Sequence, residues 1–353
     1  MIIYAFIAIM PLLFSVFFPK MNEYDKRKRR YLVLCGIVLI LFIGLRSRFV
    51  GSEDSFHYFN HLKRALLHDS WQDYYRSDYV EGGFQFFVYV LSRIFDHPQY
   101  LFVVTGMIYV IAVCYCIYKN SENVVLSMTM YITLGIMQFQ MQGMRQAIAM
   151  AICMVSFEFV KKKKIIPFAL LVLLAMQFHR TAVVIAAIYV VSILAYNVWS
   201  ILLLAICSGV VFAYTDQLMA FANDVFETDY SMTIDSGGFI ATAIYILIIV
   251  FAMFFYRKEL QQKKDKTAST IMFVTILGFV SYIMRYFGVL ISERISFYFM
   301  FGQLLLLPNA IKKMPAEYRK VVEYAVSVLC IALFLYRIRG SNFVPYQFFW
   351  QNP

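Results

Sequence analysis

Charged side chains are scarce in this sequence of 353 residues. Only 15% of the residues are Asp, Glu, Lys or Arg, whereas 61% are hydrophobic and the mean hydropathy is +0.68. Because the hydrophobic residues come in long blocks, a soluble globular chain is excluded. The composition predicts an all-α integral membrane protein, in which a polytopic helical bundle forms a single transmembrane domain over residues 1–353.

The sequence also lacks the patterns of a disulfide framework, a metal site or a nucleotide site. Its six cysteines all lie in hydrophobic blocks, and none stands at a metal-like spacing from histidine. It contains no Asp-x-Asp pair and no glycine-rich phosphate loop. We therefore expect no cofactor. The four lysines at 161–164 are interpreted as a topology signal that touches anionic membrane lipid, and we expect no nucleic-acid partner.

The hydrophobic residues form about twelve blocks that are predicted to cross the membrane as helices. The first block lacks the basic start and the small-residue cleavage site of a signal peptide, so we interpret it as a retained span. The blocks cover residues 2–18, 31–45, 100–118, 124–140, 144–160, 165–178, 181–196, 198–214, 238–256, 269–288, 295–310 and 321–337.

Basic clusters give the predicted orientation of these spans. Twelve crossings place four clusters on one side, which the positive-inside rule assigns to the cytoplasm: 20–30, 161–164, 257–266 and 312–320. The apolar stretch 83–95 would invert the later clusters if it crossed, so it is expected to lie along the outer interface or to re-enter. The two long external segments are then 46–99, with amphipathic or re-entrant helices, and 215–237.

Lysine and arginine are distributed differently between the two predicted sides. Fifteen of the sixteen lysines are cytoplasmic, whereas eleven of the sixteen arginines are external or at external helix ends. A guanidinium group grips phosphate or carboxylate with two parallel hydrogen bonds, which lysine does not match. The excess of arginine over lysine on the outer face therefore indicates a phosphate-bearing ligand there. The alternative, pairing with external acids or lipid phosphates, is favoured for Arg64, Arg76, Arg93, Arg337 and Arg339.

Several polar residues are predicted to lie at the same level, near the outer surface of the membrane. A helical bundle could bring them together in one pocket. Arg145 stands at the edge of an apolar run, in the stretch MQGMRQAIAMAI, and an ionisable group there is costly unless it serves a site or has a partner. The alternating glutamines 138, 140 and 142 indicate either an unwound chain before Gly143 or simple helix contacts. The other candidates are Arg46, Arg48, Asp54, Glu81, Gln142, Gln146, His179, Arg180, Arg285, Glu293 and Arg294.

The order of these motifs resembles the EpsG family, the bacterial Wzy-like membrane proteins of exopolysaccharide and capsule assembly. The likeness covers about residues 30–346, and its most distinctive parts are GMRQAIAMA and FHRTA. The matching motifs are GLR at 44–46, G-x-x-D at 51–54, E-G-G at 81–83, RQ-x-I-A at 145–149, FH at 178–179, ER at 293–294 and PY at 345–346.

This resemblance implies a polymerase that is a glycosyltransferase of the bacterial plasma (inner) membrane, with many spans and an outward-facing active site. Its architecture would be similar to that of O-antigen ligases and other lipid-dependent glycosyltransferases. Its substrate would be an oligosaccharide linked to undecaprenyl diphosphate, whose growing glycan chain is transferred to a hydroxyl of the next lipid-linked unit. The implied partners are membrane lipid and a chain-length regulator and flippase of the same pathway.

The resemblance also implies roles for the candidate residues. Arg145, helped by Arg294, is expected to hold the donor diphosphate, and Asp54, Glu81 or His179 is expected to take the acceptor proton. These five are the expected catalytic residues. Arg180 stands where relatives have a small hydroxyl residue. The residues expected to bind substrate are Arg46, Arg48, Gln142, Gln146, Arg180, Arg285 and Glu293.

Two other functions stay open at this stage. A flippase for lipid-linked oligosaccharide would carry polar groups through the middle of several spans, whereas here they gather at one edge. A membrane acyltransferase of exopolysaccharide assembly would need a His or Arg site that is reachable from the cytoplasm. The histidines are all predicted on the other side.

Overall fold

A computed structural model describes residues 1–19, 24–51, 53–76, 80–214, 217, 220, 238–262, 266–287 and 291–351. Within these ranges the secondary structure is helical, and the only β-type pairing is an isolated bridge between Arg46 and Phe348. The predicted all-α class is confirmed. Of the predicted external loop 215–237, only residues 217 and 220 are described.

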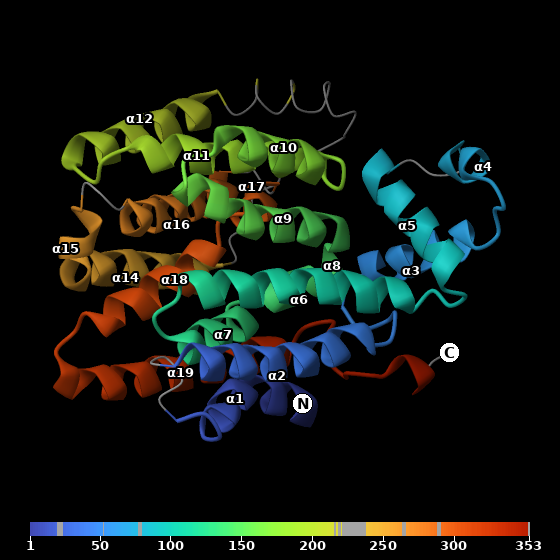
Figure 1. Ribbon diagram of the computed structural model, residues 1–353, viewed down its shortest axis with the longest axis horizontal. Helices are drawn as coiled ribbons and strands as arrows, with labels where there is room; N and C mark the ends of the chain where they lie inside the picture. The colour runs from blue at the N-terminus through green and yellow to red at the C-terminus, as the bar shows by residue number, and fades with distance from the viewer. Residues whose placement is uncertain are drawn as a thin grey trace.

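Most helices lie side by side with their axes close to one direction (Figure 1). Each of the twelve predicted blocks overlaps one of them. The bundle helices are α1 (Ile2–Ser15), α2 (Asp25–Gly44), α6 (Tyr100–Asn120), α7 (Val124–Thr133), α9 (Met144–Lys161), α10 (Ile165–Met176), α11 (Ala186–Ile193), α12 (Val198–Ala213), α14 (Phe239–Phe255), α16 (Thr267–Ile283), α18 (Phe301–Lys312) and α19 (Ala316–Ile338).

Fewer of these helices qualify as membrane spans than the sequence predicts. In the described part of the chain, three are long and apolar enough to cross a membrane, namely α6, α19 and Thr267–Tyr286, which is α16 extended into η2 (Met284–Phe287). A fourth candidate is the pair α7 and α8 (Ile136–Gln142), which is bent by 49°. A multi-pass membrane protein fits these apolar helices. Twelve crossings are not confirmed, because several of the helices in these blocks are shorter than the roughly 20 residues that a helix needs to cross a bilayer.

Small residues set how closely the central helices pack. A Cβ added to Gly44 of α2 would lie 3.0 Å from the Val103 Cα atom, and one added to Gly106 of α6 would lie 3.0 Å from Ile43. The two backbones therefore approach closely only because both positions are glycine. Large apolar side chains such as Ile111 (55% exposed) cover the outside of the same helices, as expected where lipid is the solvent.

Residues 53–94 form a separate group of three helices at one end of the bundle, here called the cap (Figure 1). It consists of α3 (Glu53–Ala65), α4 (Trp71–Arg76) and α5 (Gly82–Ile94). Its buried side chains Leu62, Phe84 and Leu91 belong to one hydrophobic cluster with Phe102 of α6 and Ile148 of α9. The apolar stretch 83–95 is thus a helix that packs with α3 and α4 beyond the end of the bundle.

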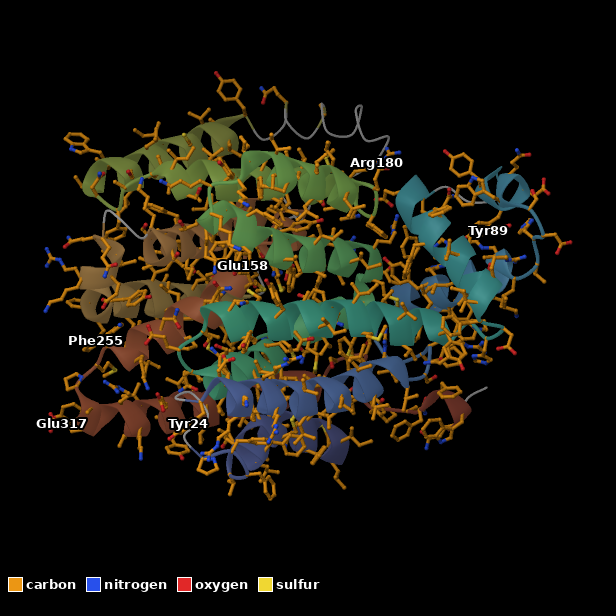
Figure 2. All side chains as sticks on the ribbon, in the orientation of Figure 1. Tyr24, Tyr89, Glu158, Arg180, Phe255 and Glu317 are labelled. Carbon is orange, nitrogen blue, oxygen red and sulfur yellow. The ribbon has the colours of Figure 1, made fainter. Side chains whose placement is uncertain are left out.

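The opposite end of the bundle carries the basic clusters. Tyr24, Phe255 and Glu317 lie there, whereas Tyr89 and Arg180 lie at the cap end (Figure 2). Lys28 Nζ donates to the Ser121 carbonyl at 3.0 Å, and Lys313 Nζ lies 3.6 Å from Glu122 and 3.3 Å from Glu259. Segments that were predicted to lie on the cytoplasmic side are therefore in contact with one another.

The end of the chain, residues 341–351, runs back across the cap end of the bundle and is here called the C-terminal strap. Its backbone pairs with the turn after α2, since Ser47 N donates to Gln347 O at 2.8 Å. Tyr346 stacks on Phe42 with ring centroids 4.8 Å apart and donates to the Phe42 carbonyl at 2.7 Å. The strap ends in the short helix η3 (Phe349–Gln351).

Candidate functional site

A cavity of about 410 Å³ opens beside the cap and is walled by α3, α8, α9, α17 (Ile291–Ser296), α19 and the C-terminal strap. Segments far apart in the sequence contribute its ionisable lining. The charged or titratable groups other than tyrosine are Asp54, Arg145, His179, Glu293, Arg294 and Arg337. Three guanidinium groups from three different helices therefore face one cavity.

Arg145 reaches this cavity from the first turn of α9. Gly143 separates α8 from α9, so the chain turns there and α9 begins with Met144. The Arg145 guanidinium forms an ion pair with Glu81 at 2.5 Å, and its Nε donates to the Tyr58 hydroxyl at 3.5 Å. Its side chain is 29% exposed. The arginine thus has an acidic partner from the cap and still presents part of its surface to the cavity.

Glu81 is the acceptor for three groups. Besides Arg145, its other oxygen lies 3.1 Å from His179 Nδ1 and accepts from the backbone N–H of Arg180 at 3.3 Å. Burial favours the neutral carboxyl, but the hydrogen bond with His179 and the charge of Arg145 outweigh it and lower the pKa of Glu81 to about 2. Glu81 is therefore an ionised carboxylate, and a carboxylate only accepts hydrogen bonds, so Nδ1 of His179 is the donor in this contact.

A close backbone contact places Glu81 beside His179. Phe84 N, in the first turn of α5, donates to the Gln177 carbonyl at the end of α10 at 3.2 Å. A Cβ added to Gly83 would lie 2.5 Å from Gln177 Cβ and 2.7 Å from its carbonyl oxygen. Only glycine allows this approach. The E-G-G motif thus positions the carboxylate that comes just before α5.

The far wall of the cavity is built around α17. Gln146 Nε2 donates to the Arg294 carbonyl at 2.5 Å, which ties α9 to α17. Arg285 forms an ion pair with Glu293 at 2.9 Å and donates to the Tyr282 hydroxyl at 3.0 Å. Among the described residues, neither Arg294 nor Arg337 forms an ion pair, so their charges are available to an anionic ligand.

The glutamines before Gly143 lie on a helix, so the unwound alternative is wrong. α8 spans Ile136–Gln142, and the break in the chain lies earlier, at Gly135 with φ of +94°. Gln138 and Gln142, one turn apart, both line the cavity. Gln140 points to the other side, where it accepts from the Tyr131 hydroxyl.

The predicted residues fall into three groups in the structure. Those that line the cavity are Asp54, Gln142, Arg145, Gln146, His179, Glu293 and Arg294. Glu81 and Arg285 do not line the cavity but pair with Arg145 and Glu293, and the backbone N–H of Arg180 donates to Glu81. Arg46 and Arg48 do not line the cavity either.

Arg46 is buried in the protein instead. It is 1% exposed, its Nη1 donates to the Ile43 carbonyl at 2.5 Å, its Nη2 donates to the Met141 carbonyl at 2.6 Å, and its guanidinium lies over the Phe102 ring. It thereby joins the ends of α2 and α8 behind the cavity. The physical reason is the C-terminal strap, which pairs with the turn that carries Arg46 and covers it.

Arg48 lies among aromatic rings of the turn after α2 and of α3. Its guanidinium carbon is 5.0 Å from the centroid of Phe49, 5.8 Å from Phe56 and 4.9 Å from Phe59. These are cation–π contacts, which hold the guanidinium against the aromatic side chains. The expected contact of Arg48 with a ligand in the cavity has no support in this geometry.

Tyr58 and Arg337 are two of the lining residues that were not among the sequence candidates. Tyr58 follows Asp54 by one helical turn, so the i, i+4 spacing on α3 was the signal that both face the same way. Arg337 was assigned to pairing with acids or lipid. It lies at the end of α19, near Gly135, where an added Cβ would be 3.7 Å from Arg337 Nη2.

No group of three or more His, Cys, Asp or Glu side chains in the described ranges is arranged to hold a metal ion. The six cysteines are all free thiols. The ionisable groups that line the cavity are instead two carboxyl groups, an imidazole and guanidinium groups. Such a set can bind an anion and exchange a proton beside it.

No curated protein and no solved structure matches the chain. The family model that matches covers residues 29–348 and therefore contains the cap, the cavity and most of the C-terminal strap. Over that range the sequence fits the description "EpsG family", and the chain belongs to this family.

Proposed function

We propose that this protein is an exopolysaccharide polymerase, a membrane glycosyltransferase that elongates lipid-diphosphate-linked glycans at the outer leaflet of the bacterial plasma membrane. Family membership and the apolar helices support a membrane protein of exopolysaccharide biosynthesis. The observation that carries the finer proposal is the convergence of Arg145, Arg294 and Arg337 on one cavity that also contains His179.

The three guanidinium groups would hold the donor diphosphate. Guanidinium offers parallel N–H donors that match phosphate oxygens, and negative charge accumulates on the diphosphate as it leaves. Donors fixed in place before the reaction stabilise that charge more strongly than water does. Arg145 is already ordered by Glu81 and Tyr58, so little reorganisation is required.

His179 would act as the general base, with Glu81 as its positioning residue. The ionised Glu81 accepts from Nδ1–H, which leaves the Nε2 lone pair for the acceptor hydroxyl. The acceptor oxygen would then form a bond to the anomeric carbon as the bond from that carbon to the diphosphate oxygen breaks. The hydroxyl proton would pass to Nε2, and the lipid diphosphate would leave as an anion. Asp54 lines the same cavity and would hydrogen-bond the sugar.

The experiment that tests the reaction class is deletion of the gene followed by analysis of lipid-linked sugars. We expect single repeat units to accumulate on the outer leaflet and polymer to be lost. Units trapped on the cytoplasmic leaflet would contradict polymerisation and support a flippase instead. The two outcomes are separated by labelling intact cells with a reagent that does not cross the membrane.

Arg145→Lys tests the anion clamp. Lysine keeps the charge but loses the two-pronged donor and cannot contact Glu81 and a phosphate in the same way. We expect polymer formation by membranes to fall by about 100-fold, the effect of one well-placed charge-stabilising donor. The control is Arg339→Lys, which replaces an exposed arginine just beyond α19. Full-length polymer from Arg145→Lys, at equal protein level, would contradict the clamp.

A further inference from the structure

A second hollow lies along α2, far from the candidate site in sequence and character. It has a volume of about 390 Å³ and is lined by Lys26, Arg29, Arg30, Val33, Leu34 and Ile37. These positions recur at intervals of three and four residues, so they form one continuous stripe on α2. The stripe is here called the α2 stripe. Its first half is cationic and its second half is apolar.

The α2 stripe lies on the outer side of the bundle. The opposite face of α2, with Tyr31, Cys35 and Leu39, is buried, and α2 packs mainly against α6. By contrast, Val33 is 54% exposed and Ile37 is 51% exposed. Tyr24, directly before α2, lies at the end of the molecule opposite the cap (Figure 2). The cations therefore stand at the bundle end, and the apolar positions run from there toward its middle.

The cations of the α2 stripe differ from neighbouring basic residues in their interaction partners. Lys28, on the inner side of the same turn, donates to the Ser121 carbonyl, and Lys313 pairs with two glutamates. Within the described ranges, Lys26, Arg29 and Arg30 form no ion pair with an acidic side chain. Three positive charges on one stripe repel each other unless an anion neutralises them.

We infer that the α2 stripe binds an anionic phospholipid of the membrane leaflet at that end of the bundle. Lys26, Arg29 and Arg30 would hold the phosphate headgroup, and Val33, Leu34 and Ile37 would contact an acyl chain. From Arg30 to Ile37 the helix rises about 10 Å, which accommodates the upper part of such a chain. Nucleic acid and soluble phosphate match only the cationic half. A lipid matches both halves, and the charge excludes a zwitterionic headgroup as the preferred one.

The test uses the purified full chain in nanodiscs that contain equal amounts of phosphatidylglycerol and phosphatidylcholine. Lipid that stays bound after release from the disc is identified by native mass spectrometry. We expect retained phosphatidylglycerol from the wild type. In Lys26→Gln/Arg29→Gln/Arg30→Gln its affinity should fall roughly fivefold for each cation removed.

The matched control is Lys162→Gln/Lys163→Gln/Lys164→Gln, which removes three charges from another basic cluster without touching the α2 stripe. It should keep the retained phosphatidylglycerol. Equal loss in both triple variants, or equal retention of both lipids by the wild type, would overturn the inference.

Two further variants serve as controls. The first tests whether loss of retention is caused by misfolding, and the second tests whether the site binds only the phosphate headgroup. Arg29→Lys/Arg30→Lys keeps the charge and the topology signal and should weaken retention only slightly. Val33→Asn/Ile37→Asn keeps every cation and should lower retention of the diacyl lipid while binding of inorganic phosphate stays unchanged. Undiminished lipid retention in this second variant would overturn the inference, because the apolar half would then have no role.

Discussion

At the scale of single residues, the arrangement around Glu81 explains why Arg145 is tolerated at the edge of an apolar run. An unpaired guanidinium there would be costly, and its partner comes from 64 residues earlier in the chain. The same carboxylate also holds His179. One acidic side chain therefore fixes both the cation and the imidazole of the candidate site.

Glu81→Gln should destabilise the protein in a pH-dependent way. The pKa of Glu81 in the folded protein, about 2, lies below its ordinary value of 4.5. Its stabilisation is therefore complete above about pH 4.5 and is lost as the pH falls toward 2, with an upper limit of about 3 kcal/mol. Thermal unfolding in detergent should show a large deficit for the variant at pH 6 and a small one near pH 2.5.

The control for this prediction is Glu317→Gln, which changes an exposed carboxyl at the opposite end of the molecule. It should unfold like the wild type at both pH values. An equal deficit for Glu81→Gln at the two pH values would show that the ion pair with Arg145 is not the cause.

At the scale of helices, hydrophobic blocks predicted the positions of the bundle helices, but not where the chain breaks. The block 124–140 is divided into α7 and α8 because Gly135 adopts a left-handed conformation that leucine or isoleucine would resist. Helix periodicity carries no information about such a break. Likewise, within the predicted external segment 46–99, the chain breaks between the end of α3 at Ala65 and the start of α4 at Trp71.

Gly83→Ala should separate α5 from α10. The new Cβ would lie 2.5 Å from Gln177 Cβ, so one of the two helices must shift. Overpacking of this kind costs about 1–3 kcal/mol, and here it also moves Glu81 away from His179. We expect polymer formation to fall by about tenfold or more, measured in membranes at equal protein level.

Gly82→Ala is the matched control, because its new Cβ would meet only the Tyr75 ring at 3.8 Å, an ordinary contact. It should retain polymer formation. If the Gly82 variant were as impaired as the Gly83 variant, helix propensity and not the contact with Gln177 would be responsible.

At the scale of the whole molecule, composition was enough to predict the all-α fold class, and the order of the motifs was enough to predict the family. The pairing of Glu81 with Arg145 was not predictable, because local periodicity gives no distance between residues on different helices. The burial of Arg46 depends on the C-terminal strap, which comes some 300 residues later in the chain. A residue can match a family motif and still serve the packing behind a cavity.

Tyr346→Ala should show how far the C-terminal strap stabilises the fold. Tyr346 packs on Phe42 of α2 and against Tyr4 of α1, so its removal opens a hole between the first two helices and the strap. We expect a loss of about 3–5 kcal/mol from the ring. Tyr346→Phe should lose only about 1 kcal/mol, from the hydrogen bond to the Phe42 carbonyl. Chemical denaturation of both variants in mild detergent measures the difference, and equal losses would contradict the packing role.

The cap supplies Glu81 but holds no part of Arg145 or His179, which belong to the bundle. The contacts of Glu81 with Arg145 and His179 therefore exist only while the cap is packed on the bundle. A molecule that separated α5 from the end of α10 would move Glu81 away from Arg145 and His179 without occupying the cavity.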